Sequence, residues 1–477
     1  MKSTFLITAS LAALVVAGCG HVSAAAPSEG AVYTNLTLID PAARTLEPDS
    51  WVLVEDGRIA ETGAGPAPAA ETARDMDGLY VMPGFIDVHG HLTAGPHAME
   101  MIDGQPTITI ESVDEITQFH ARMALAFGVA TVRNPAAPPT ASAAYDRRLE
   151  AGEWIGPDTL HAGAAIQPPP FGGSAFAYPQ TPEEYDAEAA RQAELGMTYF
   201  KLYHGLTAEE LAMGVQAAVN HGLEPIAHLD QVSWTEAARI GVKGLLHALP
   251  TSPDLLEPEA RAEFLTNRAR DGRTTYQWFE AVDLDGPLMN ELYVTLLATG
   301  ATVDLTLQVN ALTVSEDAVD VLYPREIEPY VHPRTLQSLR QFLSAAFMVW
   351  TDEDVRRSRE AMETVFAFAR RIHNEGVPVG IGTDGPGGGP FYLVELDLME
   401  QAGFSTWEIL DLATRGGAEV MRLEDETGRI APGLEADLVF LGSNPAEDLS
   451  NAGDVRWVMS NGQLHDAAAM REAARNG

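Results

Sequence analysis

Six side chains that can bind metal ions or carry protons follow short apolar runs in this 477-residue chain. They are His89, His91, Lys201, His228, His247 and Asp384. Residues two apart point to the same side of an extended strand, so His89 and His91 can grip one ion. Imidazole and oxygen ligands suit zinc and related divalent ions. The pattern therefore predicts a metal centre.

Lys201 is the unusual member of this set. The chain has only three lysines, at positions 2, 201 and 243. An ammonium at the end of an apolar strand beside histidines is costly unless it is paired. A neutral amine that has taken up CO2 becomes a carbamate, an anionic oxygen ligand that can bridge two cations. We expect this form of Lys201, although taken alone the residue would also fit an exposed strand end.

Eight short strands could position these residues. β-branched or small residues dominate runs that start near 84, 129, 159, 197, 224, 244, 301 and 379, and helix-patterned stretches follow them. This alternation predicts an α/β fold, a (β/α)8 TIM barrel, in which the carboxyl ends of all strands meet at one face. The long intervals from 244 to 301 and from 301 to 379 predict insertions that cover the substrate.

Both ends of the chain have a different sequence pattern, with short β-strand segments separated by tight turns. The Asp56-Gly57 and Asn461-Gly462 pairs are typical of β-hairpins. We predict that residues 31–82 and 425–477 pair into one small β-sandwich domain and that residues 83–424 form the barrel.

Composition excludes several classes of protein. The chain has 30 Lys+Arg against 68 Asp+Glu and a formal net charge of −38, which excludes a nucleic-acid binder driven by phosphate contacts. Its 46% hydrophobic residues predict a globular, enzyme-sized chain. We expect a small molecule as its substrate. Cys19 is the only cysteine, so neither a disulfide within the chain nor a second thiol is available.

The first residues are typical of an export signal. Lys2 precedes an apolar run over 5–17 that is too short to span a bilayer. The residues Val16-Ala17-Gly18-Cys19 resemble the bacterial lipobox. We expect a signal peptide over 1–18, a lipidated linker over 19–30, and a lipoprotein anchored through Cys19 that faces the periplasm. Cleavage near residues 22–24, which would leave a soluble periplasmic protein, stays open, as does a homo-oligomer.

Several motifs in this order resemble the amidohydrolase superfamily of metal-dependent hydrolases, in its imidazolonepropionase and prolidase-like branch. They are VMPGFIDVHGH at 81–91, the strand-ending Lys201, His228 and His247, GTD at 382–384, TRGGAE at 414–419 and GRIAPGLEADLV at 428–439. The resemblance implies that His89 and His91 bind a buried metal and that the Lys201 carbamate bridges to a second metal, held by His228 and His247. It assigns Asp384 to the first metal and to proton transfer. Zinc is favoured, and iron, manganese or cobalt also fit.

The resemblance also implies a reaction, the hydrolysis of an amide C–N bond by a hydroxide that bridges the two metals. Asp384 would take the proton and return it to the leaving nitrogen. We expect a dipeptide of the Xaa-Pro kind or an N-acyl amino acid as the substrate. Two alternatives remain, a cyclic amide or lactone hydrolase on the same centre and a non-catalytic binding lipoprotein.

Three residues are candidates for substrate binding. Tyr203 follows Lys201 by two, so its hydroxyl could meet a substrate carboxylate or the attacked oxygen, unless it is a packing residue. His204 is expected at the pocket mouth, and Arg133 could clamp an anion at the end of the second strand. The other histidines, His97 among them, are expected at surface or packing positions.

Overall fold

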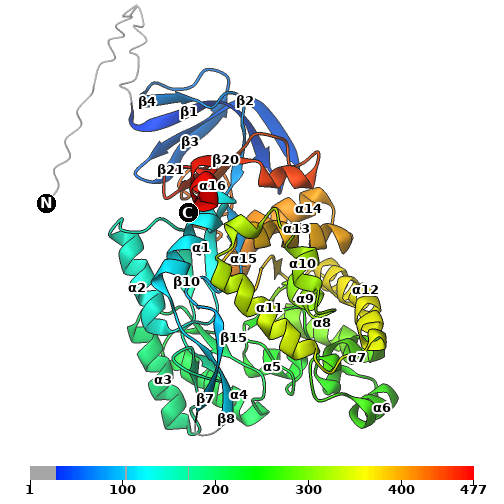
Figure 1. The fold of residues 1–477 in the computed structure, drawn as a ribbon. Coiled ribbons are helices and arrows are strands. Elements are labelled where there is room, and N and C mark those ends of the chain that lie inside the picture. Colours follow the sequence, from blue (N-terminus) through cyan, green and yellow to red (C-terminus); the bar gives the residue numbers. More distant parts are fainter. Residues whose placement is uncertain (1–27, 103–104, 170, 477) are drawn as a thin grey trace, which may run out of the picture.

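The computed structural model describes residues 28–102, 105–169 and 171–476 (Figure 1). The predicted signal peptide and Cys19 lie outside the described residues. The chain forms a barrel with surrounding helices, and strands from both chain ends form a sheet at one side of it (Figure 1).

The sheet domain contains eight strands from the two ends of the chain. They are β1 (Ser28–Asp40), β2 (Thr45–Glu55), β3 (Arg58–Ala64), β4 (Ala70–Asp75), β5 (Tyr80–Pro83), β19 (Leu438–Leu441), β20 (Val455–Ser460) and β21 (Gln463–Asp466). Their order is β21-β20-β19-β5-β1-β2-β3, and β4 also pairs with β1. β5 joins the two ends, because it pairs with β1 on one side and β19 on the other. The predicted small domain built from both termini is thus confirmed.

Local sequence explains this sheet. Asp56 and Gly57 both have positive φ, as do Asn461 and Gly462, which matches the tight hairpin turns predicted at these pairs. The eight strands of this domain lie in one continuous sheet. Its edge strand β3 also contacts the segment that follows the barrel, because the Ile59 N–H donates to the Leu434 carbonyl at 2.9 Å. Side chains from both chain ends, such as Val52 and Phe440, share one buried core.

The barrel contains eight parallel strands. They are β6 (Phe85–Asp87), β9 (Val129–Asn134), β10 (Asp158–His161), β14 (Tyr199–Leu202), β15 (Glu224–Ala227), β16 (Gly244–Leu245), β17 (Thr302–Asp304) and β18 (Val379–Gly380). β6, β9 and β10 pair in one group, and β14 to β18 pair in order in another. A parallel bridge between Ala162 and Tyr199 links the groups on one side, and the Val88 N–H donates to the Ile381 carbonyl at 2.9 Å on the other. The predicted TIM barrel is confirmed.

Helices cover the outside of the barrel. They are α1 (Asp114–Ala126), α2 (Pro139–Glu150), α3 (Pro182–Glu194), α4 (Ala208–Asn220), α5 (Trp234–Ile240), α6 (Pro258–Asn267), α7 (Arg273–Ala281), α8 (Pro287–Thr299), α12 (Asp352–Asn374), α13 (Pro390–Gln401), α14 (Thr406–Asp411) and α15 (Gly417–Met421). Several begin at a hydroxyl side chain that accepts a backbone N–H, and Thr207 forms a reciprocal capping box with Glu210 at the start of α4. The last helix, α16 (Ala467–Asn476), packs on both α1 and β20.

Several barrel strands are followed by inserted segments. A hairpin of β7 (His97–Ile102) and β8 (Gln105–Ile110) follows β6, and β12 (Phe171–Gly172) adds to its sheet. The short strand β11 (Ala165–Ile166) pairs with β14, and β13 (Phe176–Ala177) pairs with β11 on its other side. The segment between β17 and β18 contributes α9 (Leu307–Leu312), α10 (Ala318–Leu322) and α11 (Pro333–Phe347). α11 lies against β7, so two insertions that are far apart in sequence meet.

Candidate metal centre

All six predicted residues lie at the carboxyl ends of barrel strands. Five of them, His91, Lys201, His228, His247 and Asp384, line one cavity of about 420 Å³. His89 is fully buried behind them, with its ring centroid 4.4 Å from that of His247. The convergence predicted from the barrel geometry is therefore present.

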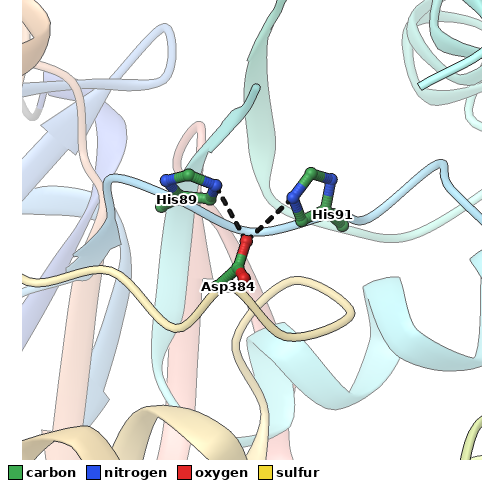
Figure 2. Close-up of side chains that lie close together, drawn as sticks. All are labelled: His89, His91 and Asp384. Atoms are coloured by element: carbon green, nitrogen blue, oxygen red, sulfur yellow. Dashed lines mark hydrogen bonds and ion pairs between the residues drawn. The ribbon is translucent and has the colours of Figure 1, made fainter. Parts of the chain in front are cut away.

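His89, His91 and Asp384 form the tightest group (Figure 2). Asp384 Oδ1 lies 2.9 Å from Nε2 of His89 and 2.9 Å from Nε2 of His91. The Nδ1 atoms face acceptors, 2.8 Å from Asp304 Oδ2 for His89 and 2.9 Å from the Ala136 carbonyl for His91. Each Nδ1 therefore carries its hydrogen, and the two Nε2 lone pairs converge on a carboxylate oxygen. Imidazole nitrogens and a carboxylate oxygen are ligands that divalent metal ions take, so these residues fit such an ion.

The electrostatics of this group agree with that need. Burial lowers the pKa of His89, but the carboxylates of Asp304 and Asp384 outweigh burial and raise it above its usual value. Burial raises the pKa of Asp384, yet the imidazoles of His247 and His89 hold it well below its usual range. The site thus favours positive charge between the rings and an ionised carboxylate.

His228 and His247 form the second group. Their ring centroids are 4.5 Å apart, and His247 Nδ1 lies 3.0 Å from the Thr306 hydroxyl. His228 Nδ1 is buried without a hydrogen-bond partner among the described residues, which is rare for a buried polar atom. Burial lowers the pKa of both rings well below the usual value. Neutral imidazoles with free nitrogens fit a second metal ion.

Lys201 points into the same cavity. Its side chain is buried, and its Nζ lies 4.9 Å from the centroid of the Tyr203 ring. Burial lowers the pKa of Lys201 to about 8, although Asp384 and Asp304 act in the opposite direction. A larger fraction of neutral amine follows, which is the form that combines with CO2.

Hydrogen bonds hold the ends of β6 and β18 together, most of them through the carboxylate of Asp87. Asp87 accepts the N–H of His89 at 3.0 Å, the N–H of Thr383 at 3.0 Å and the Thr383 hydroxyl at 2.7 Å. The Asp384 N–H donates to the His89 carbonyl at 2.7 Å. Gly382 permits this approach, because a Cβ there would lie 2.6 Å from that of His89. His247 and Asp384 have positive φ values of 74° and 49°, and such strain is concentrated at functional sites.

Asp304, at the end of β17, was missed in the sequence analysis. It is fully buried and contacts His89 Nδ1, the His247 N–H at 2.6 Å and the guanidinium of Arg133 at 3.0 Å. A carboxylate that orients a ligand histidine is a common support for metal sites. The signal was a carboxylate that closes the short run of small and β-branched residues over 301–303, in the same position as the other site residues.

Tyr203 and His204 line the cavity as predicted for substrate contacts. The Tyr203 ring stands at 87° to the His228 ring, with centroids 4.9 Å apart. Burial raises the pKa of Tyr203, so its hydroxyl remains a hydrogen-bond donor. His204 Nε2 lies 3.2 Å from Nε2 of Gln167.

Arg133 differs from the predicted anion clamp. Its side chain is fully buried inside the barrel, and it is not among the residues that line the cavity. Nε donates to the Val88 carbonyl at 2.6 Å, and Nη2 donates to Asp304. The guanidinium is therefore occupied by buried partners of the barrel, and it holds Asp304 instead of a ligand in the cavity.

Comparisons with known proteins agree with this geometry. The model of the Amidohydrolase family matches residues 80–465. An imidazolonepropionase from Streptomyces coelicolor is 25% identical over 451 residues, which cover 87% of this chain and 93% of that protein. Among solved structures, the bottromycin amidohydrolase has a TM-score of 0.67 at 20% identity and covers 94% of this chain and 92% of that one. A putative prolidase from Bifidobacterium longum has a TM-score of 0.64 at 21% identity, and the match covers 94% of this chain and 100% of that one.

The two structural similarities show the fold alone, whereas the family model spans most of the chain and includes every candidate ligand. The chain therefore belongs to the Amidohydrolase family and is a hydrolase that acts on carbon–nitrogen bonds.

Proposed function

We propose that this protein is an exported enzyme that uses two divalent metal ions, zinc foremost, to hydrolyse the amide bond of an N-acyl amino acid or an Xaa-Pro-like dipeptide. The observation that carries this proposal is the convergence of four imidazoles, one buried lysine and one carboxylate at one cavity. A binding protein without catalysis would not need the buried Lys201 or the strained Asp384.

Each residue has a place in this proposal. His89, His91 and Asp384 would hold one ion, and His228 and His247 would hold the other. Lys201, as a carbamate, would lie between them. When bound, such ions lower the pKa of water and polarise a carbonyl oxygen.

The protein groups supply the proton transfers and the orientation. Asp384 takes a proton from the attacking water at Oδ1 or Oδ2 and returns it to the leaving nitrogen, a role that suits an ionised carboxylate inside the cavity. The Tyr203 hydroxyl, held protonated by burial, donates to the substrate carbonyl or carboxylate. His204 lies beside it and completes a polar end of the cavity.

The similar proteins support two substrate types. The prolidase among the solved structures favours a dipeptide-like amide, whereas the imidazolonepropionase favours a second candidate, a cyclic amide on the same centre. The lipobox-like residues 16–19 support export and attachment to the membrane through Cys19.

Metal analysis combined with a substrate panel tests the proposal. We expect about two metal ions per chain and hydrolysis of N-acyl amino acids or Xaa-Pro dipeptides in preference to hydantoins and lactones. Full chelation should abolish the activity, and readdition of zinc should restore it. Activity that survives complete metal removal would overturn the metal-dependent mechanism, and a preference for the cyclic compounds would favour the second candidate.

A further inference from the structure

Six apolar side chains that line the cavity come from segments outside the barrel strands, and we call them the apolar wall. They are Ile108, Ile110, Phe171, Leu339, Phe342 and Leu343. They come from the β7–β8 hairpin, from β12 and from α11, none of which belongs to the minimal barrel. The wall is therefore a feature of the insertions and not of the metal centre.

The wall is a connected structure. Phe171 pairs with Ile108 in one sheet, which joins β12 to the hairpin. The Ser338 hydroxyl on α11 donates to the His97 carbonyl at 3.1 Å, and the His97 ring stacks on Phe342 at 5.8 Å and 24°. His97, expected at a surface or packing position, thus lines the cavity and links the hairpin to α11.

Charge is scarce in this cavity. Among the described residues that line it, Lys201 is the only lysine and Asp384 is the only carboxylate, and there is no arginine. Both belong to the proposed metal centre. An ammonium group on a substrate that faced the wall would find no carboxylate of its own, and burial of an unpaired charge is costly. An apolar group there would instead cover Phe342, whose side chain is 44% exposed.

We infer that the apolar wall binds a bulky, uncharged acyl group, so that the enzyme acts on N-acyl amino acids and discriminates against free dipeptides. This inference rests on the proposed amide hydrolysis and narrows its two substrate classes to one. The polar end with Tyr203 and His204 then faces the amino acid part of the substrate.

A matched series of proline amides tests the inference with the metal-loaded enzyme. The series comprises acetyl-, butanoyl-, hexanoyl- and octanoyl-proline, together with 2-aminooctanoyl-proline, which differs from octanoyl-proline only by an α-ammonium. We expect kcat/KM to rise about threefold per methylene up to hexanoyl. The added ammonium should lower it by about tenfold or more.

Variants locate the effect on the wall. Phe342→Ala should lower kcat/KM for octanoyl-proline about tenfold and for acetyl-proline less than twofold, because only the longer chain reaches this ring. Phe342→Glu should reduce the discrimination against 2-aminooctanoyl-proline. Leu297→Ala is the matched control, since Leu297 on α8 has a similar 45% exposure and lies outside the cavity.

The outcomes separate the inference from the proposed function. Chelator-sensitive hydrolysis with no dependence on chain length, or with a preference for the amino compound, would overturn the apolar-group inference and leave the amidohydrolase proposal intact. If no member is hydrolysed, the proposed substrate class fails, and calorimetric titration of ketone analogues, in which CH replaces the proline nitrogen, decides the inference. Tighter binding of the octanoyl ketone than of its 2-amino counterpart supports it, and equal or weaker binding refutes it.

Discussion

At the scale of single residues, the candidate centre depends on how each donor atom is oriented. Asp304 and Ala136 accept the Nδ1 hydrogens of His89 and His91, which leaves both Nε2 atoms directed toward Asp384. Lys201 completes the set from β14, and burial makes its ammonium form less favourable. These residues act as a unit, so removal of one should affect metal content as well as rate.

Lys201→Ala should therefore abolish activity and lower the metal content, because the proposed bridging oxygen ligand is lost. A short-chain carboxylic acid such as propionate should restore part of both, since its carboxylate can occupy the space of the carbamate. Metal per chain by mass spectrometry and kcat with and without propionate would be measured, with Lys243→Ala as the control. Unchanged metal content in the Lys201 variant would contradict a bridging role.

Arg133→Met should destabilise the fold by about 3 kcal/mol, because Asp304 would lose its buried cationic partner. Urea unfolding measures this change. Arg356→Met is a suitable control, since the ion pairs of Arg356 are on the surface and contribute little. If Arg133 were an anion clamp, the variant would raise KM and leave the unfolding free energy unchanged.

At the scale of elements, the strand ends bring the site together, and the junction between the barrel and the small sheet carries a separate cluster of carboxylates. Asp158 at the start of β10 and Glu435 and Asp437 before β19 have oxygens within 4.8 Å of one another. Burial raises the pKa of Asp437 to about 7 and that of Asp158 to about 6. Ionisation of this cluster opposes the packing of the two parts.

The contribution of this cluster to the free energy of unfolding should consequently fall as the pH rises from about 4 to about 7. Folded Asp437 keeps its proton to a higher pH than the unfolded chain does, so its contribution is present at low pH and is lost as pH rises through about 7. Asp437→Asn should reduce this fall by about 2 to 3 kcal/mol in urea unfolding. Asp397→Asn, at an exposed position on α13, is the control, and identical pH profiles for wild type and Asp437→Asn would contradict the role of this carboxyl group.

At the scale of the whole molecule, the chain has a formal net charge of −38, whereas one wall of its cavity is apolar. Such a charge makes copies of the chain repel one another. Within the described residues, no helix is long and apolar enough to cross a bilayer.

Membrane attachment is proposed to depend on Cys19 alone. Cys19→Ala should move the protein from the membrane fraction to the soluble fraction when the full chain is expressed in a bacterial host, because the lipid would no longer be attached. Fractionation and immunoblotting provide the measurement, and Ser23→Ala serves as a neighbouring control. Continued association of the Cys19 variant with membranes would contradict lipidation at this residue.

The amino-acid sequence by itself determined the barrel and the members of the candidate centre. Five of the eight barrel strands end at or near a residue of the candidate centre, as the strands before His89 and His228 do, and parallel strands in a barrel bring their carboxyl ends together. Tight turns at pairs such as Asn461-Gly462 could also be predicted from the sequence, because only a few residue types readily adopt a positive φ.

Only the tertiary structure decided what Arg133, Asp304 and Phe342 do. Arg133 and Asp304 are 171 residues apart, and their pairing depends on which side chains meet inside the closed barrel. Phe342 reaches the cavity because α11 packs on a hairpin that follows the first barrel strand. A local signal such as the carboxylate at the end of residues 302–304 can place a side chain at the strand ends. Which partner that side chain meets is set by the long-range packing of whole elements.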